Sequence, residues 1–310
     1  IPDSVTSIGS SAFSGCTSLT NMTIPDSVTS IGSYAFYGCT SLTSVTIPDS
    51  VTSIGNSAFY GCTSLINITI GRDVTSTLDD IFDSYNKLER INVSEENTKY
   101  SSIQGILFNK EKSTIIKYPS NKNDISNYEI PSTVEIIEKY AFQNCTSLTS
   151  VTIPDSVTNI SGSAFIGCNK LERINVSENN DTYSSVDGIL YNKEKTEMLI
   201  VPEGNKSIGR IETPHSYYNN MSETYSKIIE GASSLSLVFD SKCELESSYD
   251  YIEIYNKTDT LVYTSKGKGN KALANKEITV EGDTVKIHFY TDQSNVYWGF
   301  KCLVKASNTK

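Results

Sequence analysis

Side chains that commonly carry catalysis are few in this sequence of 310 residues. It contains two histidines, His215 and His288, which are far apart in the chain. Neither is close to a GxSxG motif, a reactive-cysteine setting or a metal ligand at helical spacing. No pair of acids can be assigned to a cleft of the kind that glycoside hydrolysis needs. The residue types therefore predict a binding protein and not an enzyme.

Cysteines are the other reactive group, and five of the seven occupy one position of a sequence repeat. Equivalent side chains in a stack of repeats point the same way, and an odd number cannot all pair. We therefore expect buried thiols, and not disulfides or metal ligands. Cys243 and Cys302 lie outside the repeats and could either pair with each other or remain free. The five repeat cysteines are Cys16, Cys39, Cys62, Cys145 and Cys168.

Hydrophobic residues make up 37% and charged residues 20% of the chain, values typical of a soluble protein. The net charge is −10, with most of the excess acid before Ile211. Such a surface repels phosphate backbones, so nucleic acid is not an expected partner. No run approaches the roughly 20 apolar residues of a membrane span. The chain opens inside a repeating phrase without a leader, so we expect a fragment whose secretion signal and surface anchor lie outside it.

A repeat of 23 residues dominates the chain up to residue 209. Near-copies of IPDSVTSIG begin at Ile1, Ile24, Ile47 and Ile153, with a diverged copy at Ile130. One repeat has too few apolar residues to close a core, but stacked repeats align identical side chains into continuous columns. Each alternating run before the IPD phrase predicts a strand that ends at a Pro-Asp turn. Stacking therefore predicts one long parallel sheet, with the phenylalanine of each repeat in the core.

The repeats resemble those of the BspA-like, or Treponema-type, leucine-rich-repeat family. The resemblance rests on IPDSVTSIG, on the AFxGC motif (AFSGC, AFYGC twice and AFIGC) and on the TSL that follows, and it covers residues 1–209. It implies a β-rich solenoid in a surface or secreted protein of host-associated bacteria or some protozoa. It also implies adhesion to host matrix or to other cells.

Two related segments interrupt the period, one starting at Leu88 and the other at Leu171. In each, a glycine (Gly105 or Gly188) precedes an apolar run and an Asn-Lys turn, so we predict two β-hairpins that project from the solenoid. The second hairpin is expected to close the end of the stack. The hairpins also offer a candidate binding surface of aromatic residues, although some of these rings are expected to pack on the solenoid. The rings are those of Tyr100, Phe108, Tyr183 and Tyr191.

Over residues 210–310 the repeat is absent and short strand-like runs follow one another. Gly, Asn, Asp and Lys turns separate the runs and no helical period intervenes, which predicts an antiparallel β-sandwich. The predicted strands are Leu235–Phe239, Tyr251–Tyr255, Thr260–Tyr263, Glu277–Val280, Thr284–Tyr290 and Phe300–Val304.

This second domain resembles a CUB domain of the jelly-roll type. The phrases ELESSYDYIEIYN and GDTVKIHFYTDQSNVYWGFKCLV carry the resemblance. Residues 214–219 are a loose counterpart of the family's opening turn, and the family's cysteine pattern is only partly kept.

In calcium-binding CUB domains, three acids from separate segments hold one Ca²⁺. The resemblance assigns these roles to Glu246, Asp250 and Asp292, with carbonyl groups near Ser294 and Asn295 completing the shell. Ca²⁺ prefers six to eight oxygen ligands, and converging carboxylates repel each other unless a cation or protons intervene. The resemblance further implies that these acids engage a basic side chain of a partner. Alternatively, the acids are merely solvated on separate loops.

A polar strip follows the outward positions of the predicted solenoid sheet. It presents hydroxyls and amides with two arginines, and solenoid proteins use such extended faces for binding. Threonine and serine also favour strands without any ligand, so both interpretations stay open. The strip comprises Asn21, Thr23, Ser44, Thr46, Asn67, Thr69, Arg90, Asn92, Ser150, Thr152, Arg173 and Asn175.

Together these features predict an extracellular or cell-surface adhesion protein that recognises a host, matrix or cell-surface protein, with a Ca²⁺-dependent contact in the second domain. Glycan binding is an alternative, because jelly-roll sandwiches often bind sugars. The stacking rings would be Tyr249, Tyr251, Tyr290, Tyr297 and Trp298. A further alternative is a structural spacer that displays another domain.

Overall fold

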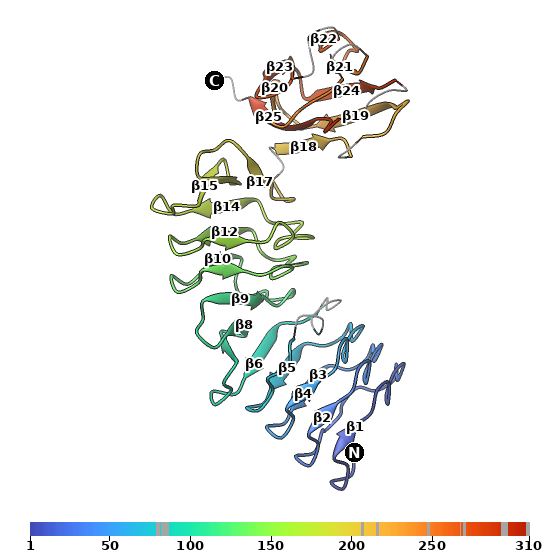
Figure 1. The fold of residues 1–310 in the computed structure, drawn as a ribbon, viewed down its shortest axis with the longest axis vertical. Coiled ribbons are helices and arrows are strands. Elements are labelled where there is room, and N and C mark those ends of the chain that lie inside the picture. The colour runs from blue at the N-terminus through green and yellow to red at the C-terminus, as the bar shows by residue number, and fades with distance from the viewer. Residues whose placement is uncertain are drawn as a thin grey trace. The chain divides into compact units, whose positions relative to one another are not determined.

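The computed structural model forms two compact units of strands and turns (Figure 1). One unit comprises Ile1–Ile189 with Pro202–Gly204, and the other Leu190–Val201 with Asn205–Lys310. No helix occurs among the residues that the structure describes. These are residues 1–78, 81, 87–205, 208–214, 217–246, 249–266, 268, 271–292 and 297–307.

The first unit is a solenoid whose successive coils pair strand to strand in parallel (Figure 1). Each coil places its Ser-Val-Thr-Ile strand, or the equivalent, against that of the next coil. Alternate residues of these strands are buried, as the sequence pattern predicts. One three-stranded sheet contains β3 (Ser44–Ile47), β5 (Asn67–Ile70) and β6 (Arg90–Val93). A second contains β10 (Asn127–Glu129), β12 (Ser150–Ile153) and β14 (Arg173–Val176).

Shorter parallel ladders run along another side of the coils. They keep the 23-residue offset, because Ser7 lies opposite Ser30 and Ser30 opposite Ser53. The strands of one ladder are β1 (Ser7–Ile8), β2 (Ser30–Ile31) and β4 (Ser53–Ile54). The strands of a second short ladder are β11 (Ile136–Ile137) and β13 (Asn159–Ile160). This ladder continues the sheet that the first insertion forms.

The interior of the solenoid is a column of rings, as predicted. Phe36 is fully buried and stacks on Phe13 and Phe59, with ring centroids 5.1 Å apart on both sides. Phe142 and Phe165 continue the pattern at 4.8 Å. Repeat thiols lie beside this column, and the Cys62 Sγ donates to the Phe36 carbonyl oxygen of the preceding coil at 3.3 Å.

Each insertion is a three-stranded meander, and the predicted projection from the solenoid is wrong for the first. Gln104 and Gly105 both have positive φ, which suits a tight two-residue turn between antiparallel strands. The third strand then pairs in parallel with β11, so the meander is part of the solenoid wall. Its strands are β7 (Tyr100–Ile103), β8 (Ile106–Asn109) and β9 (Thr114–Lys117).

The rings of the first meander do not form the predicted exposed surface. Tyr100 is 5% exposed and Phe108 is fully buried, because the meander adds its apolar face to the solenoid core. Tyr183 and Tyr191 of the second meander are half-buried. The second meander consists of β15 (Tyr183–Val186), β16 (Ile189–Asn192) and β17 (Met198–Ile200).

The meanders also replace the single long sheet of the prediction with two short ones. The Ile91 amide of β6 donates to the Gly105 carbonyl at 2.9 Å, so the first turn lies against the last strand of its sheet. Ile174 and Gly188 repeat this contact at 2.8 Å. Each meander therefore covers the final edge of one three-stranded sheet.

The second unit is an antiparallel sandwich of two four-stranded sheets around one apolar core. One sheet has the order β18 (Ile208–Glu212), β25 (Lys301–Ser307), β20 (Ser234–Phe239) and β23 (Glu277–Glu281). The other has the order β19 (Ser222–Ile228), β24 (Thr284–Tyr290), β21 (Tyr251–Asn256) and β22 (Leu261–Thr264).

All seven cysteines are free thiols in this structure. Cys243 and Cys302 are both buried in the sandwich core, and the Cys243 Sγ donates to the Lys301 carbonyl oxygen at 3.4 Å. The repeat cysteines other than Cys16 are buried, in line with the expected structural role.

Candidate functional site

Three acids of the sandwich converge at one end of a strand pair. Tyr251 of β21 lies opposite Tyr290 of β24, so the residues just before β21 and just after β24 meet at the same end of this ladder. Asp250 and Asp292 occupy these positions, and Glu246 reaches the same point from the preceding loop. One carboxylate oxygen from each lies within 4.8 Å of the others.

Hydrogen bonds hold the central acid in place. The Tyr217 hydroxyl donates to Asp250 Oδ2, and the Asp292 amide donates to Asp250 Oδ1 at 3.1 Å. The Asp250 amide donates to the Glu246 carbonyl oxygen at 3.3 Å, which ties the backbones of these two acidic residues together. Tyr217 itself is buried and packs edge-on against Phe289, with ring centroids 5.1 Å apart. The cluster is therefore anchored to the sandwich core.

Electrostatics at this cluster favour a cation. Burial raises the pKa of the Asp250 carboxyl, and the nearby Glu246 charge raises it further, although hydrogen bonds from Tyr217 and two backbone amides act in the opposite direction. Burial and the neighbouring carboxylate likewise raise the pKa of Tyr217, so its hydroxyl remains a donor at neutral pH. Three acids at this separation repel one another unless positive charge lies between them.

The donor set fits Ca²⁺. It offers carboxylate oxygens only, which hard divalent cations prefer, and no sulfur or imidazole ligand from the described residues. The three acids already lie together in this structure, with Glu246 and Asp250 four residues apart and Asp292 contributed by the segment after β24. Ser294 and Asn295, the proposed sources of carbonyl ligands, lie outside the described residues, as does His215.

Tyr217 was not assigned a role from sequence, although it lies within the segment 214–219 that resembles the opening turn of the domain. Its place in that segment is the one feature of the sequence that points to it. The local pattern does not indicate that the Tyr217 hydroxyl bonds Asp250, which is 33 residues away in the chain.

The structure places the predicted polar strip on the outward face of the solenoid sheets. Ser44, Asn67 and Arg90 form one cross-strand row. Thr46, Thr69 and Asn92 form the second row of that sheet. In the other sheet, Ser150 pairs with Arg173 and Thr152 with Asn175. Asn21 and Thr23 are exposed in the first coils, just outside assigned strands.

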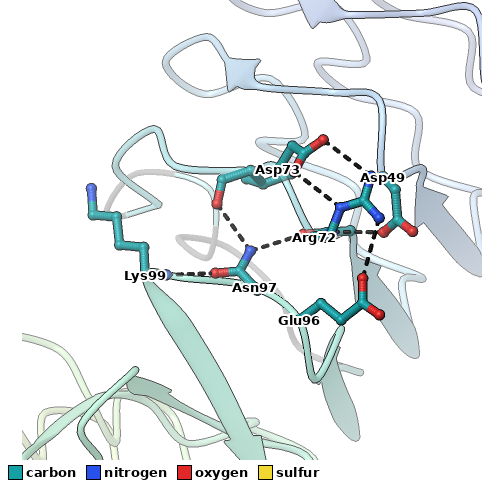
Figure 2. A network of polar contacts seen from close by, with 8 residues as sticks. Asp49, Arg72, Asp73, Glu96, Asn97 and Lys99 are labelled. Atoms are coloured by element: carbon teal, nitrogen blue, oxygen red, sulfur yellow. Dashed lines mark hydrogen bonds and ion pairs between the residues drawn. The ribbon is translucent and has the colours of Figure 1, made fainter.

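A polar network that sequence analysis missed joins three coils near this strip (Figure 2). Arg72 bonds Asp73 at 3.1 Å and Glu96 at 3.2 Å, and its amide donates to Asp49 Oδ1 at 2.6 Å. Beside it, the fully buried Asn97 donates to the Gly71 and Val74 carbonyls.

Comparison with known families agrees with this architecture. The BspA type leucine rich repeat region matches residues 1–115 and 113–212, in six copies. The chain belongs to this BspA-type repeat family. Residues 199–303 match the CUB domain. Both types of domain typically mediate binding. Among the described residues of this BspA-type protein, no helix is long and apolar enough to cross a membrane.

Solved structures similar to this BspA-type protein include surface proteins of bacteria. The pneumococcal vaccine antigen PcpA is 25% identical, with a TM-score of 0.47, over 56% of this chain and 49% of that one. A leucine rich cell surface protein of Faecalibacterium prausnitzii is 36% identical, with a TM-score of 0.37, over 56% of this chain and 40% of that one. The chain thus spans half or less of these two structures.

For the second domain, the MASP-1 CUB2 domain bound to Ca²⁺ is 21% identical, with a TM-score of 0.29, over 32% of this chain and 93% of that one. Zinc finger ZZ-type and EF-hand domain-containing protein 1 of Mus musculus is 32% identical over 95 residues, which are 31% of this chain and 3% of that protein. The chain covers only this small share of the mouse relative.

Proposed function

We propose that this BspA-type protein is an extracellular or cell-surface adhesion protein that recognises a protein of the host, the matrix or another cell. The second domain contributes a Ca²⁺-dependent contact. The observation that carries the calcium part is the convergence of Glu246, Asp250 and Asp292, with oxygens within 4.8 Å, around a buried aspartate of raised pKa. The repeat family and the bacterial cell-surface relative support the adhesion part.

Each acid has a distinct task in this proposal. Asp250, 5% exposed and held by Tyr217, is the fixed central ligand. Glu246 and Asp292 are half-buried, so they lie between that ligand and solvent. When bound, Ca²⁺ would neutralise the mutual repulsion of the three acids and hold the two loops in one arrangement. Carboxylate oxygens on the solvent side would then accept hydrogen bonds from a lysine or arginine of the partner.

Calorimetric titration of the full chain with CaCl₂ tests the metal site, and Mg²⁺ is the control cation. We expect saturable heat for Ca²⁺ at micromolar to millimolar concentration and none for a variant with Asp250→Asn. Absence of heat with millimolar Ca²⁺ argues against the site.

Binding to a panel of immobilised matrix proteins, with Ca²⁺ and with EDTA, tests the adhesion function. We expect at least one protein to bind in Ca²⁺ and to be released by EDTA. A chain that binds Ca²⁺ but no protein on such a panel or on host cells would contradict the adhesion function and leave the metal site intact.

Glycan binding is a second candidate, favoured by Tyr249, whose side chain is 60% exposed beside the acid cluster. The other candidate rings are less accessible. Tyr251 and Tyr290 stack on each other at 4.7 Å with the Lys266 ammonium over Tyr251, and Tyr297 and Trp298 pack against the core. A glycan array with Tyr249→Ala as the comparison variant separates the two candidates.

If residues 1–209 can be deleted without loss of adhesion, the solenoid is a spacer.

A further inference from the structure

Two grooves occur at equivalent places of the two three-stranded solenoid sheets. The first has a volume of about 460 Å³ and follows Thr46 and Thr69 at the carboxyl ends of β3 and β5. The second, of about 610 Å³, follows Thr152 at the carboxyl end of β12. Both continue over the Pro-Asp turn that ends the strand, at Asp49 in one and Asp155 in the other. Equivalent positions of the repeat therefore line both grooves, although one acid differs in position: Ser132 corresponds to Asp26, and Glu129 to Thr23.

The polar part of both groove linings consists of acids and hydroxyls, and it lies beside a larger apolar part formed mainly by isoleucine and proline side chains. The first contains Asp26 and Asp49, and the second contains Glu129 and Asp155, and all four acids are exposed. No lysine, arginine or aromatic residue belongs to the described lining of either groove. Such walls accept hydrogen bonds from cations, repel anions and give a sugar ring no aromatic face on which to stack.

We propose that the two grooves are a duplicated docking site for extended polypeptide segments that carry lysine or arginine side chains. The inference rests on the proposed function and names the chemistry of its protein partner. Each groove receives a basic side chain between its paired acids, and the threonine hydroxyls face the backbone of the segment.

The chain itself contains an example of the contact. Arg72 occupies the repeat position that is aspartate in Asp26 and Asp49, and its guanidinium binds Asp73, the next residue in the chain, and Glu96 of the following coil (Figure 2). These two carboxylates neutralise the Arg72 guanidinium next to the end of the first groove, where Gly71 and Ser94 form the wall. An arginine that enters the first groove from a partner meets Asp26 and Asp49, which lie at equivalent positions of two successive coils.

Duplication gives the site a way to raise affinity. A single exposed ion pair strengthens binding by about fivefold at most, which is weak. Two grooves in one rigid stack convert the second contact into an intramolecular one and raise the overall affinity without new chemistry. A partner with repeated basic residues therefore binds more tightly than one with a single basic cluster.

Fluorescence anisotropy on the full chain tests the proposal with a labelled peptide of alternating arginine and glycine, and a glutamate-glycine peptide serves as the acidic probe. We expect saturable binding of the arginine peptide alone. The variant Asp26→Asn with Asp49→Asn should weaken it about fivefold, as should Glu129→Gln with Asp155→Asn. The fourfold variant should weaken it at least about thirtyfold, because both contacts are lost.

A matched control removes the same charge outside the grooves. Glu111 and Glu194 are exposed and occupy equivalent positions of the two meanders, so Glu111→Gln with Glu194→Gln should leave binding within about twofold. An equal loss in this control, or no binding of the arginine peptide at 150 mM salt, overturns the proposal. Preferential binding of an uncharged oligosaccharide in the grooves also overturns it.

Failure of the grooves is distinguishable from failure of adhesion. If a matrix protein binds the wild type and the fourfold variant equally, the docking proposal is wrong and the adhesion function stands. If the arginine peptide binds through the grooves but no protein of a matrix or cell-surface panel does, the adhesion function is wrong and the docking site stands.

Discussion

The hydroxyl of Tyr217 donates a hydrogen bond to the Asp250 carboxylate, which joins two segments 33 residues apart and places a buried donor behind the acid cluster. Replacing Tyr217 by Phe removes that donor while keeping the ring in contact with Phe289. We expect Ca²⁺ affinity to fall about tenfold, as is typical when a partner of a metal ligand is lost. Calorimetry measures the change, with exposed Tyr249→Phe as the control that should bind normally. Equal affinities of the two variants would contradict this role.

Exchange of Asp250 for Asn should separate metal binding from stability. The raised pKa means that the folded domain disfavours the ionised carboxylate. This charge is therefore fully destabilising above the raised pKa, and the penalty is lost progressively as pH falls from there to below the ordinary aspartate pKa of the unfolded chain. In EDTA at neutral pH, Asp250→Asn should therefore melt at the same temperature as the wild type or higher, with the difference vanishing towards acid pH. Added Ca²⁺ should raise the melting temperature of the wild type alone. A variant that melts lower in EDTA would refute the electrostatic argument.

Asn97 is a buried bridge between neighbouring coils. Its amide donates to the Gly71 and Val74 carbonyls, and its oxygen accepts from the Lys99 and Tyr100 amides. Because Asn97→Ala leaves these buried groups without partners, we expect a loss of about 3 kcal/mol or more in unfolding free energy. Urea denaturation measures it.

The exposed Asn92 provides the matched control for that experiment. Asn92→Ala should change stability by no more than about 0.5 kcal/mol. Asn97→Asp should be nearly as damaging as the alanine variant, since a carboxylate cannot donate to the two carbonyls. A stable Asn97→Asp protein would show that the bridge is dispensable.

Thiol labelling should distinguish Cys16 from the rest of the cysteine column. Burial raises the pKa of Cys62 to about 12 and also raises those of Cys39 and Cys145, so these thiols stay protonated and unreactive at pH 8. Cys168 is buried in the same column and is shielded from a reagent in the native chain. Cys16 is exposed. We expect one modified cysteine per native chain with a small disulfide reagent, none for Cys16→Ser, and labelling of the remainder in denaturant. More than one rapid modification of the native wild type would contradict the buried column.

The repeat made the solenoid predictable in detail. Phe36, Phe59 and Phe165 are buried because each occupies the same position of its repeat, where the side chain points into the core. The repeat is visible in the sequence alone, without knowledge of which distant residues are in contact. The meander was harder to place. Its apolar run indicated strands but not which wall they join, so it could not decide which rings pack on the solenoid, as the buried Phe108 does.

In the sandwich, prediction failed where the local pattern is weak. Strand β19, Ser222–Ile228, was missed because its residues are mostly exposed and polar, and only pairing with β24 makes it a strand. The acid cluster was assigned by resemblance. Its physical basis is the register that sets Tyr251 opposite Tyr290, which no single segment encodes.

The turns at Gly105 and Gly188 have a consequence for behaviour in solution. Unpaired strand borders invite a second molecule to add its own strand, and this is a common start of fibrils. In this protein the Ile91 and Ile174 amides at those borders are already bonded by the chain's own turns. These two amides are therefore not free to pair with a strand from a neighbouring molecule, which disfavours aggregation through these borders.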